Sequence, residues 1–576
     1  MVSISLVLKT IAATTALVLG QQPAIAGFDP SAKTPAVSGP LPSSTSQGMS
    51  KEDYAFLQSP QTQQLLSLLG GGANITSAAV AAMFGDSRLD VWTTLMTKLV
   101  QGKVDKWAQP QANSAITIPK EQKELTKTTL LNTNIQIPVD DEDWPDDAAL
   151  EVKAATFIRD YAPFIDDFKQ TWKAGENKEG YVMSKVGKMW PKVHVFWNDR
   201  YSDKALNLLV FNGVGSHLVE KLPQRQRDGS YYAVTLNFMD QLEVRPGFAK
   251  YGADAYFNSY GEIVKIVRQN RTYYPNDKLW EYIKMAFRGS LMTKITAIDH
   301  LLGLHMTVGN YLTTVSREQL PPDHPLRRLI KPFTFRAVAI NRAAARSLFW
   351  TKAYMHRALA LTDAGLTQTW KTGTDSFKFE TFPETVARQN IDTVNLPFHN
   401  DGMSYWNIVR KFVGDYVNLY YRSDDDVVKD TSVEAFWAAF NSKMPMQLRP
   451  LTMKNLKDTL AQAIFWVTAM HNHMGNVAEY VSDPAFMPGA WVEGELAARP
   501  GAAVRQAVIM ALTGLQQPSI LDDFSHVMLD NKAKKVCKDF NNGLTALGFV
   551  NDFQNAFRDQ AFTTFNPQLM DISVGI

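Results

Sequence analysis

The chain has 576 residues, of which 45% are hydrophobic and 20% are charged, and its formal net charge is +2. A chain of this length can bury a large core, and a charge so close to zero argues against nucleic acid as a partner. Its one cysteine, Cys537, excludes an internal disulfide. The 31 Phe and 21 Met residues indicate an adaptable apolar interior, which is compatible with holding a lipid chain but is shared by any large helical core.

The chain begins with a stretch that is typical of a targeting segment. In residues 1–26 the only charged side chain is Lys9, and the stretch ends on the sequence AIA, which fits the A-x-A rule for signal-peptide cleavage. We therefore expect a secretory signal and a secreted or periplasmic protein, with a plastid import segment as the alternative. Residues 27–50 are rich in Pro, Ser, Gly and Thr and are expected to form a disordered linker.

Residues 51–147 are predicted to be a helical N-terminal region with a connector. Helical periodicity covers residues 51–107, with a break at the glycines of residues 70–72, and residues 108–147 have few apolar periods. This part of the sequence has no succession of alternating strands of the kind that an N-terminal β-domain would show. We interpret residues 108–147 as an irregular connector that lies on the domain that follows it.

The predicted main domain, residues 148–576, is mainly α with a few short strands. Alternating apolar residues predict strands at Thr235–Val244 and Ala255–Ile266. Helical periodicity predicts further elements in chain order. These helices cover residues 149–172, 337–360, 404–421, 433–442, 453–481 and 505–513.

A long helix at Glu281–Leu312 is predicted to lie at the centre of this domain. The stretch has no proline and is apolar around most of its circumference, as expected for a buried helix. It contains His300 and His305 with the spacing H-x4-H, and five residues of an α-helix turn about 140° away from the starting face. The two imidazoles can therefore share one metal only if the helix widens to a π-type turn. The alternative is that they are hydrogen-bonded core histidines.

Several motifs, one before this helix and the others after it, stand in the order of a known family. His324 opens HPLRRLIKPF, and INRAAARSLF follows from Ile340. Residues 401–430 read DGMSYWNIVRKFVGDYVNLYYRSDDDVVKD, residues 464–480 read IFWVTAMHNHMGNVAEY, and residues 196–222 read FWNDRYSDKALNLLVFNGVGSHLVEKL. With the two histidines and a terminal isoleucine, the chain resembles the lipoxygenase family, as a divergent member that lacks the N-terminal β-domain, like some bacterial and algal members.

The resemblance implies a lipoxygenase-type helical catalytic domain that holds one non-haem iron, with manganese as the alternative metal. Histidine, amide and carboxylate donors without a thiolate suit such an ion. His471 and Asn476 correspond to the third histidine and the asparagine of the family, but one more residue separates them here than in the family, which leaves the Asn476 ligand open. His473 is the alternative to His471 as the third histidine. The implied ligands are His300, His305, His471, Asn476 and the terminal carboxylate of Ile576.

The implied activity is dioxygenation of a polyunsaturated fatty acid by O2, in which a metal-bound hydroxide rather than a side chain removes the hydrogen. The product is a lipid hydroperoxide. A small residue that influences the face of oxygen attack in the family corresponds to Ala345, or equally to Ala344. A monomer with a peripheral contact to membrane or lipid is also expected.

Two departures from the family keep other functions open. Thr296 and Glu479 stand where the family commonly has Gln residues that link the metal ligands to the substrate channel, and changes around the ligands alter metal-site activity. The alternatives are a hydroperoxide isomerase or lyase, an inactive lipid binder, or a metal-free helical binding protein.

The C-terminal sequence FNPQLMDISVGI contains no lysine or arginine, and apolar residues alternate along it from Met570 to Ile576. This pattern predicts an extended tail that enters the apolar interior. The alternative is a frayed terminus, as is usual for chain ends.

Overall fold

In a computed structural model, the chain divides into two compact units, residues 1–47 and 48–576. All described residues belong to the second unit. The targeting segment, the linker, residues 51–115, and the predicted helices at 149–172 and 505–513 lie outside the described residues, apart from Trp172. The described residues are 116–130, 133–139, 172–173, 200–348, 355, 358–477, 480, 486–498 and 518–575.

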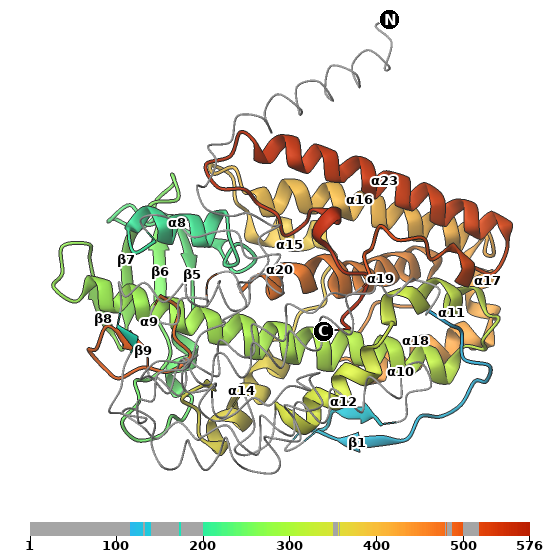
Figure 1. Ribbon diagram of the computed structural model, residues 1–576, viewed down its shortest axis with the longest axis horizontal. Helices are drawn as coiled ribbons and strands as arrows, with labels where there is room; N and C mark the ends of the chain where they lie inside the picture. The colour runs from blue at the N-terminus through green and yellow to red at the C-terminus, as the bar shows by residue number, and fades with distance from the viewer. Residues whose placement is uncertain are drawn as a thin grey trace, which may run out of the picture. The chain divides into compact units, whose positions relative to one another are not determined.

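One continuous helix passes through the middle of the second unit (Figure 1). It consists of α9 (Trp280–Thr293), the π-helix η4 (Lys294–Gly309) and α10 (Asn310–Gln319). Nearly every side chain of the first two parts is buried, which confirms the central buried helix predicted from the apolar circumference. The helix ends before two consecutive prolines, Pro321 and Pro322, which lack the backbone N–H needed to continue it.

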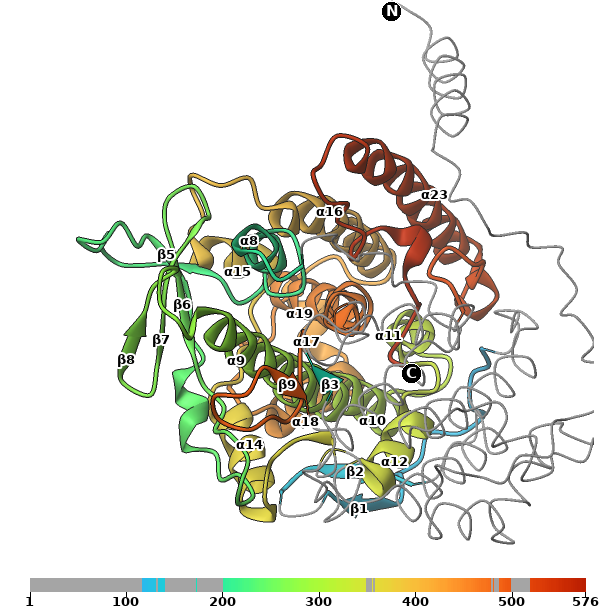
Figure 2. The same ribbon diagram turned by 60° about the vertical axis from the view of Figure 1, so that its left-hand side comes forward.

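The other helices pack around this central helix, and the fold is mainly α as predicted. Helix α14 packs against η4, α18 packs against α10, and α16 lies between α19 and α23. Figure 2 shows several of them nearly end-on. Their bounds are α8 Asp203–Phe211, α11 Pro325–Ile330, α12 Ala337–Ser347, α14 Asp363–Asp375, α15 Phe382–Gln389, α16 Pro397–Asn418, α17 Asp424–Lys429, α18 Thr431–Lys443, α19 Met453–Phe465, the π-helix η6 Trp466–Met470, α20 His471–Gly475 and α23 Asn531–Asn555.

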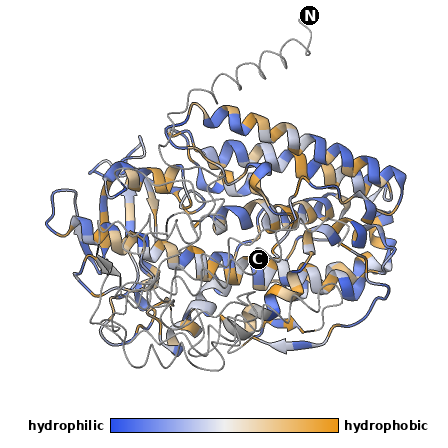
Figure 3. Cartoon of the chain, viewed as in Figure 1, coloured by the Kyte–Doolittle hydropathy of each residue, from blue (hydrophilic) through white to orange (hydrophobic). Residues whose placement is uncertain are grey.

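The outer helices have one apolar face. Figure 3 shows apolar and polar bands alternating along α16 and α23, as expected when one side packs on the core and the other meets solvent. Among the described helices, none has both the length and the apolarity to cross a membrane.

The largest sheet among the described residues is a five-stranded antiparallel meander of β4 (Glu220–Lys221), β5 (Tyr232–Val234), β6 (Asp254–Phe257), β7 (Ile263–Arg268) and β8 (Arg271–Tyr273). The strand predicted over Ala255–Ile266 is found as the β6–β7 hairpin.

The strand predicted over Thr235–Val244 is wrong, because Asn237–Gln241 forms a 3-10 helix. The Asp254 carboxylate accepts hydrogen bonds from the backbone N–H groups of Leu236 and Asn237, at 2.6 and 2.8 Å. These bonds satisfy two donors that a strand would have paired along a ladder. The carboxylate therefore turns the chain out of the sheet at this point.

The described part of the expected connector contains a hairpin, β1 (Lys127–Thr129) with β2 (Gln136–Pro138), that packs on the end of the central helix. Asn310 Nδ2 donates to the carbonyl oxygen of Gln136 at 2.8 Å, and Lys127 pairs with Glu318 at 2.6 Å. The segment is therefore more regular than expected, and the domain boundary at residue 147 stays a prediction. The short strands β3 (Trp172–Lys173) and β9 (Ala497–Ala498) also pair with each other.

Candidate metal centre

The π-helix η4 brings His300 and His305 together, although they lie five residues apart. Their Nε2 atoms are 3.2 Å apart and their ring centroids are 4.8 Å apart. In a regular α-helix the two side chains would point about 140° away from each other. The wider turn that the H-x4-H spacing requires is therefore present where the two histidines need it.

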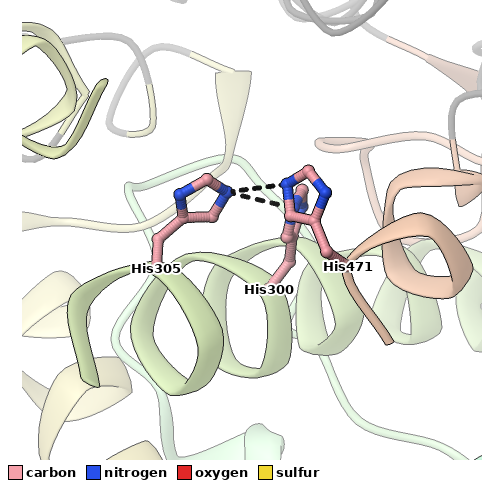
Figure 4. Close-up of side chains that lie close together, drawn as sticks. All are labelled: His300, His305 and His471. Atoms are coloured by element: carbon pink, nitrogen blue, oxygen red, sulfur yellow. Dashed lines mark hydrogen bonds between the residues drawn. The ribbon is translucent and has the colours of Figure 1, made fainter. Parts of the chain in front are cut away.

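A third imidazole arrives from a neighbouring helix. His471 begins α20, immediately after the second π-helical stretch, η6, and its Nε2 lies 3.2 Å from Nε2 of His305. Figure 4 shows the three rings gathered above the central helix. One ring nitrogen from each of the three lies within 4.8 Å of the others, and all three side chains are buried.

Burial keeps the two helix histidines neutral. Desolvation, with the neighbouring His305, holds the pKa of His300 well below its usual range. Desolvation also lowers the pKa of His305 to about 4, against a smaller opposing effect of Asn341. Neutral imidazole is the form that binds a metal, because it presents a lone pair instead of a proton.

Asn341, on α12, determines which nitrogen of His305 is free. Its amide Nδ2 donates to the backbone carbonyl oxygen of His305 at 2.9 Å. Since a carbonyl oxygen can only accept, the opposite atom of the amide must be Oδ1, which lies 3.3 Å from Nδ1 of His305. Nδ1 therefore carries the proton, and the Nε2 lone pair faces the other two imidazoles.

The three nitrogens fit a transition-metal ion. Nitrogen ligands that sit about 2.1 Å from one ion at angles of 90–109° lie about 3.0 to 3.4 Å from each other, and the two Nε2 pairs measured here are 3.2 Å apart. An all-imidazole set without thiolate suits iron, zinc, copper or nickel better than calcium or magnesium.

Asn476 has the environment of a further ligand. Its side chain is 3% exposed, and its Oδ1 has no hydrogen-bond partner among the described residues. An unsatisfied buried acceptor is costly, so its presence calls for an explanation such as an ion. Thr296 shares this property, because its buried Oγ1 is also unpartnered within the described part of the chain. Ala344 and Ala345 are buried on α12.

The C-terminal tail runs into the interior as far as Gly575. Met570, Ile572 and Val574 are buried, and the Ser573 hydroxyl donates to the carbonyl oxygen of Phe335 at 2.8 Å. A Cβ atom added to Gly309, at the end of η4, would lie 3.1 Å from Val574 Cγ2, so the tail contacts the central helix. Ile576 lies outside the described residues, as does Glu479.

His473 points away from the three imidazoles. Its Nε2 lies 3.0 Å from Nδ1 of His217, and its Nδ1 lies 3.2 Å from the Thr564 hydroxyl. On its other side, Nε2 of His217 lies 3.3 Å from Oδ2 of Asp299. Burial opposes ionisation of Asp299, but Lys294 and His217 outweigh it and hold the pKa of this carboxyl below its usual range.

Neither this polar chain nor the contact of Asn341 with His305 was predicted from the sequence. The only local signal was position, because Asp299 directly precedes His300 and Asn341 lies in the INRAAAR motif. His324 is likewise apart from the three imidazoles: it pairs with Asp430 at 3.1 Å and caps α11.

A cavity of about 690 Å³ adjoins the same helices. Ile298 of η4, Trp466 of η6 and Met470 and Met474 form part of its wall, and Lys294 and Asp299 add charge. None of the three clustered imidazoles is among its lining residues. The cavity is thus adjacent to the candidate metal centre without opening directly onto it.

Comparison with known proteins gives one family throughout. A family model described as Lipoxygenase matches residues 258–488, a stretch that includes the three histidines and Asn476. The linoleate 9/13-lipoxygenase of Pseudomonas aeruginosa is 30% identical over 184 residues, which are 30% of this chain and 26% of that protein. The polyunsaturated fatty acid lipoxygenase ALOX15B of Rattus norvegicus is 26% identical over 204 residues, which are 34% of this chain and 30% of that protein.

Solved structures match over a larger part of the chain. A calcium-dependent 11R-lipoxygenase has a TM-score of 0.68 at 15% identity and covers 82% of this chain and 80% of its own. A lipoxygenase from Fusarium graminearum has a TM-score of 0.64 at 15% identity and covers 79% of this chain and 97% of its own. The solved structures share the fold of this chain, and the matched sequences span less than a third of either curated relative.

Proposed function

The chain belongs to the lipoxygenase family, and from that membership we propose that it is a non-haem iron dioxygenase that inserts O2 into a polyunsaturated fatty acid to give a lipid hydroperoxide. The observation that carries this proposal is the convergence of three buried imidazoles, His300, His305 and His471, on one point beside the central helix. Histidines that only pack in the core would not need three buried ring nitrogens to converge on one point.

In this proposal the three histidines hold the iron, with Asn476 and the terminal carboxylate of Ile576 as further ligands. When bound, the iron supplies one-electron redox chemistry and a base for the hydrogen that leaves the substrate. The protein residues bury the site and keep their imidazoles neutral, and Asn341 fixes the orientation of one ring. Manganese remains the alternative metal, to be distinguished by elemental analysis.

The proposed substrate is a fatty acid with neighbouring cis double bonds, either free or esterified. A related structure was solved with arachidonate, and the bacterial relative is named for linoleate. Ala345 and Ala344, both buried on α12, are the candidates for control of the face of oxygen attack. The proposed location is outside the cell or in the periplasm, with a plastid as the alternative.

A hydroperoxide isomerase or lyase is the second candidate function. Thr296 stands four residues before His300, where the family commonly has Gln, and its buried hydroxyl lacks a partner among the described residues. The hydroxyl of threonine reaches less far from the backbone than the amide of glutamine, so the link between metal ligands and substrate differs here from the family pattern. This difference favours a change in chemistry at the same metal.

The test combines metal content with activity. The purified protein is expected to contain about one iron per chain, to consume oxygen with linoleate or arachidonate, and to form a conjugated diene that absorbs in the near ultraviolet. His300→Ala and His305→Ala should lose the metal, whereas His399→Ala, a buried histidine on α16 that contacts Gln389 instead, should keep it. Unchanged metal content in both cluster variants would sink the assignment. A metal-replete protein that consumes only hydroperoxides would favour the isomerase or lyase.

The proposed Ile576 ligand has its own test. One residue added after Ile576 would move the carboxylate out of reach, and deletion of Ile576 would leave the tail too short. Both changes should lower metal content and abolish activity, while a tag at the N-terminus should change neither. A fully active protein with a C-terminal tag would refute this ligand.

A further inference from the structure

Helix α23 has an outer face that nothing in the described part of the chain covers. Its inner face packs against α16 through buried side chains that include Cys537, Phe540 and Leu544. Figures 1 and 2 both show α23 at the outside of the helices, next to α16. The residues on its other side are therefore available for contacts outside the described chain.

Large apolar side chains gather at the C-terminal end of this outer face. Phe549, Phe553 and Phe557 are 65%, 62% and 77% exposed, and Val550 is 48% exposed. Phe549 and Phe553 lie four residues apart, the spacing of neighbours on one helical face, and Phe557 follows just beyond the end of α23. The rings of Phe553 and Phe557 contact each other edge to face at 5.1 Å. We call these four residues the α23 aromatic patch.

Exposed lysines occupy the N-terminal end of the same face. Phe549 follows Lys538 by 11 residues and Lys535 by 14, which correspond to about three and four helical turns, so these side chains lie in one line. Lys532 and Lys534 are exposed nearby. Lys535 pairs with Asp539 at 2.8 Å, and Asp552 is exposed next to Phe553. The four lysines and these two aspartates leave α23 with a net charge of +2. Lysines and exposed aromatic rings along one face are typical of a helix that lies in a membrane interface.

The size and shape of the α23 aromatic patch favour lipid over protein. Taking a phenylalanine side chain as about 200 Å², the exposed parts of the patch amount to about 450 Å², whereas a stable dimer buries about 800 Å² per partner. The patch is also the ridge of a helix, whereas peptide recognition commonly uses a groove or a free sheet edge. Projecting rings can enter a bilayer interface without a complementary surface.

We propose that the outer face of α23 is a peripheral membrane-docking surface, with the α23 aromatic patch inserted among the lipids and Lys535 and Lys538 on anionic headgroups. The inference goes beyond the proposed function, because it requires neither the metal nor catalysis. Docking through this face would place the protein on the lipid bilayer, which contains fatty acyl chains.

The test is vesicle binding by the full chain, measured by sedimentation. The triple variant Phe549→Ser, Phe553→Ser, Phe557→Ser is expected to lower binding to phosphatidylcholine–phosphatidylserine vesicles by at least about tenfold. The matched control is Tyr260→Ser, which removes an aromatic side chain that is 81% exposed at the turn between β6 and β7. This control should bind as the original protein does. Phe557→Ser alone, beyond the end of α23, should cause part of the loss.

The charge component is tested separately. Lys535→Glu with Lys538→Glu should remove the advantage of phosphatidylserine-containing vesicles over phosphatidylcholine alone, and added salt should have the same effect on the original protein. All variants should keep their metal content, thermal midpoint and activity on a soluble fatty acid, which separates this test from that of the proposed function. The proposal is overturned if the original protein does not bind vesicles or if the triple variant binds as well. It is also overturned if the triple variant only converts a dimer into a monomer.

Discussion

Replacement of Asn341 by alanine tests whether an amide outside the ligand set controls the candidate metal centre. The Asn341 side chain contacts His305 twice, through Nδ1 of the ring and through the backbone carbonyl oxygen. The carbonyl oxygen also accepts the backbone N–H of Asn310 and therefore keeps a partner in the variant. The ring Nδ1–H would lose the acceptor that Asn341 provides.

The expected effect follows from that loss. A buried donor left without an acceptor costs about 1–3 kcal/mol, and the imidazole becomes free to change tautomer or to rotate. Loss of such an outer contact commonly lowers metal affinity by about 10- to 100-fold, or about 1.4 to 2.7 kcal/mol. We expect Asn341→Ala to fall in this range, with the protein folded and the three histidines still in place.

The assay is iron retention during titration with a competing chelator, followed by elemental analysis. Gln389→Ala is the matched control, because Gln389 is also a buried amide with two donor bonds to backbone carbonyls and a contact to a histidine, but its histidine is His399. This control should retain iron as the original protein does. Equal affinity in Asn341→Ala and the original protein would refute the role of the amide.

Three further results are expected. His471→Ala should lose most of the metal, whereas His473→Ala should keep it, because Nε2 of His473 faces His217 instead of the cluster; elemental analysis of both variants decides between them. Arg558→Ala should destabilise the protein by about 3 kcal/mol at neutral pH by leaving the buried Asp401 carboxylate without its partner. Burial already raises the pKa of Asp401 against the opposing effect of Arg558, so protonation of Asp401 is favoured in the folded state. The loss of stability in Arg558→Ala should therefore shrink as the pH falls, or when Asp401→Asn is added. Urea unfolding at two pH values measures this change. Gly402→Ala should cost about 1–3 kcal/mol in urea unfolding, because its Cβ would lie 2.3 Å from a buried phenylalanine ring, and an unchanged midpoint would show that the aromatic cluster yields to the methyl group.

The parts of the fold that depend on local pattern could be predicted from the sequence. The central helix is apolar all round, and the H-x4-H spacing itself specifies a wider helical turn if the two imidazoles are to meet. Periodicity also predicts α18 and the start of α19 to within two residues, whereas α16 begins seven residues earlier than expected. The helix predicted over 337–360 is too long, because α12 ends at Ser347, and α23 was not predicted. Thr235–Val244 was misread because its alternation is real but is overruled by Asp254, which approaches from the next strand.

The surroundings of the candidate site could not be predicted in the same way. Asn341 meets His305 across 36 positions of sequence, and His217 meets His473 across 256. No local spacing encodes such contacts, because they arise only when separate helices pack. His471 was distinguished from His473 by resemblance alone, since two neighbouring histidines on one short helix have equal chemical claims until the direction of each ring is known.

The π-helical stretch also has a consequence at a distance, because its winding sets the rotational phase of α10. Each residue of a π-helix turns the chain by less than a residue of an α-helix does. If the sixteen residues of η4 were wound as an α-helix, α10 would be rotated about the helix axis relative to its present position. Asn310 and Glu318 would then turn away from Gln136 and Lys127. The contacts of the β1–β2 hairpin with α10 therefore require the same π-helical winding that brings His300 and His305 together. Loss of those contacts should remove part of the stabilisation of that winding.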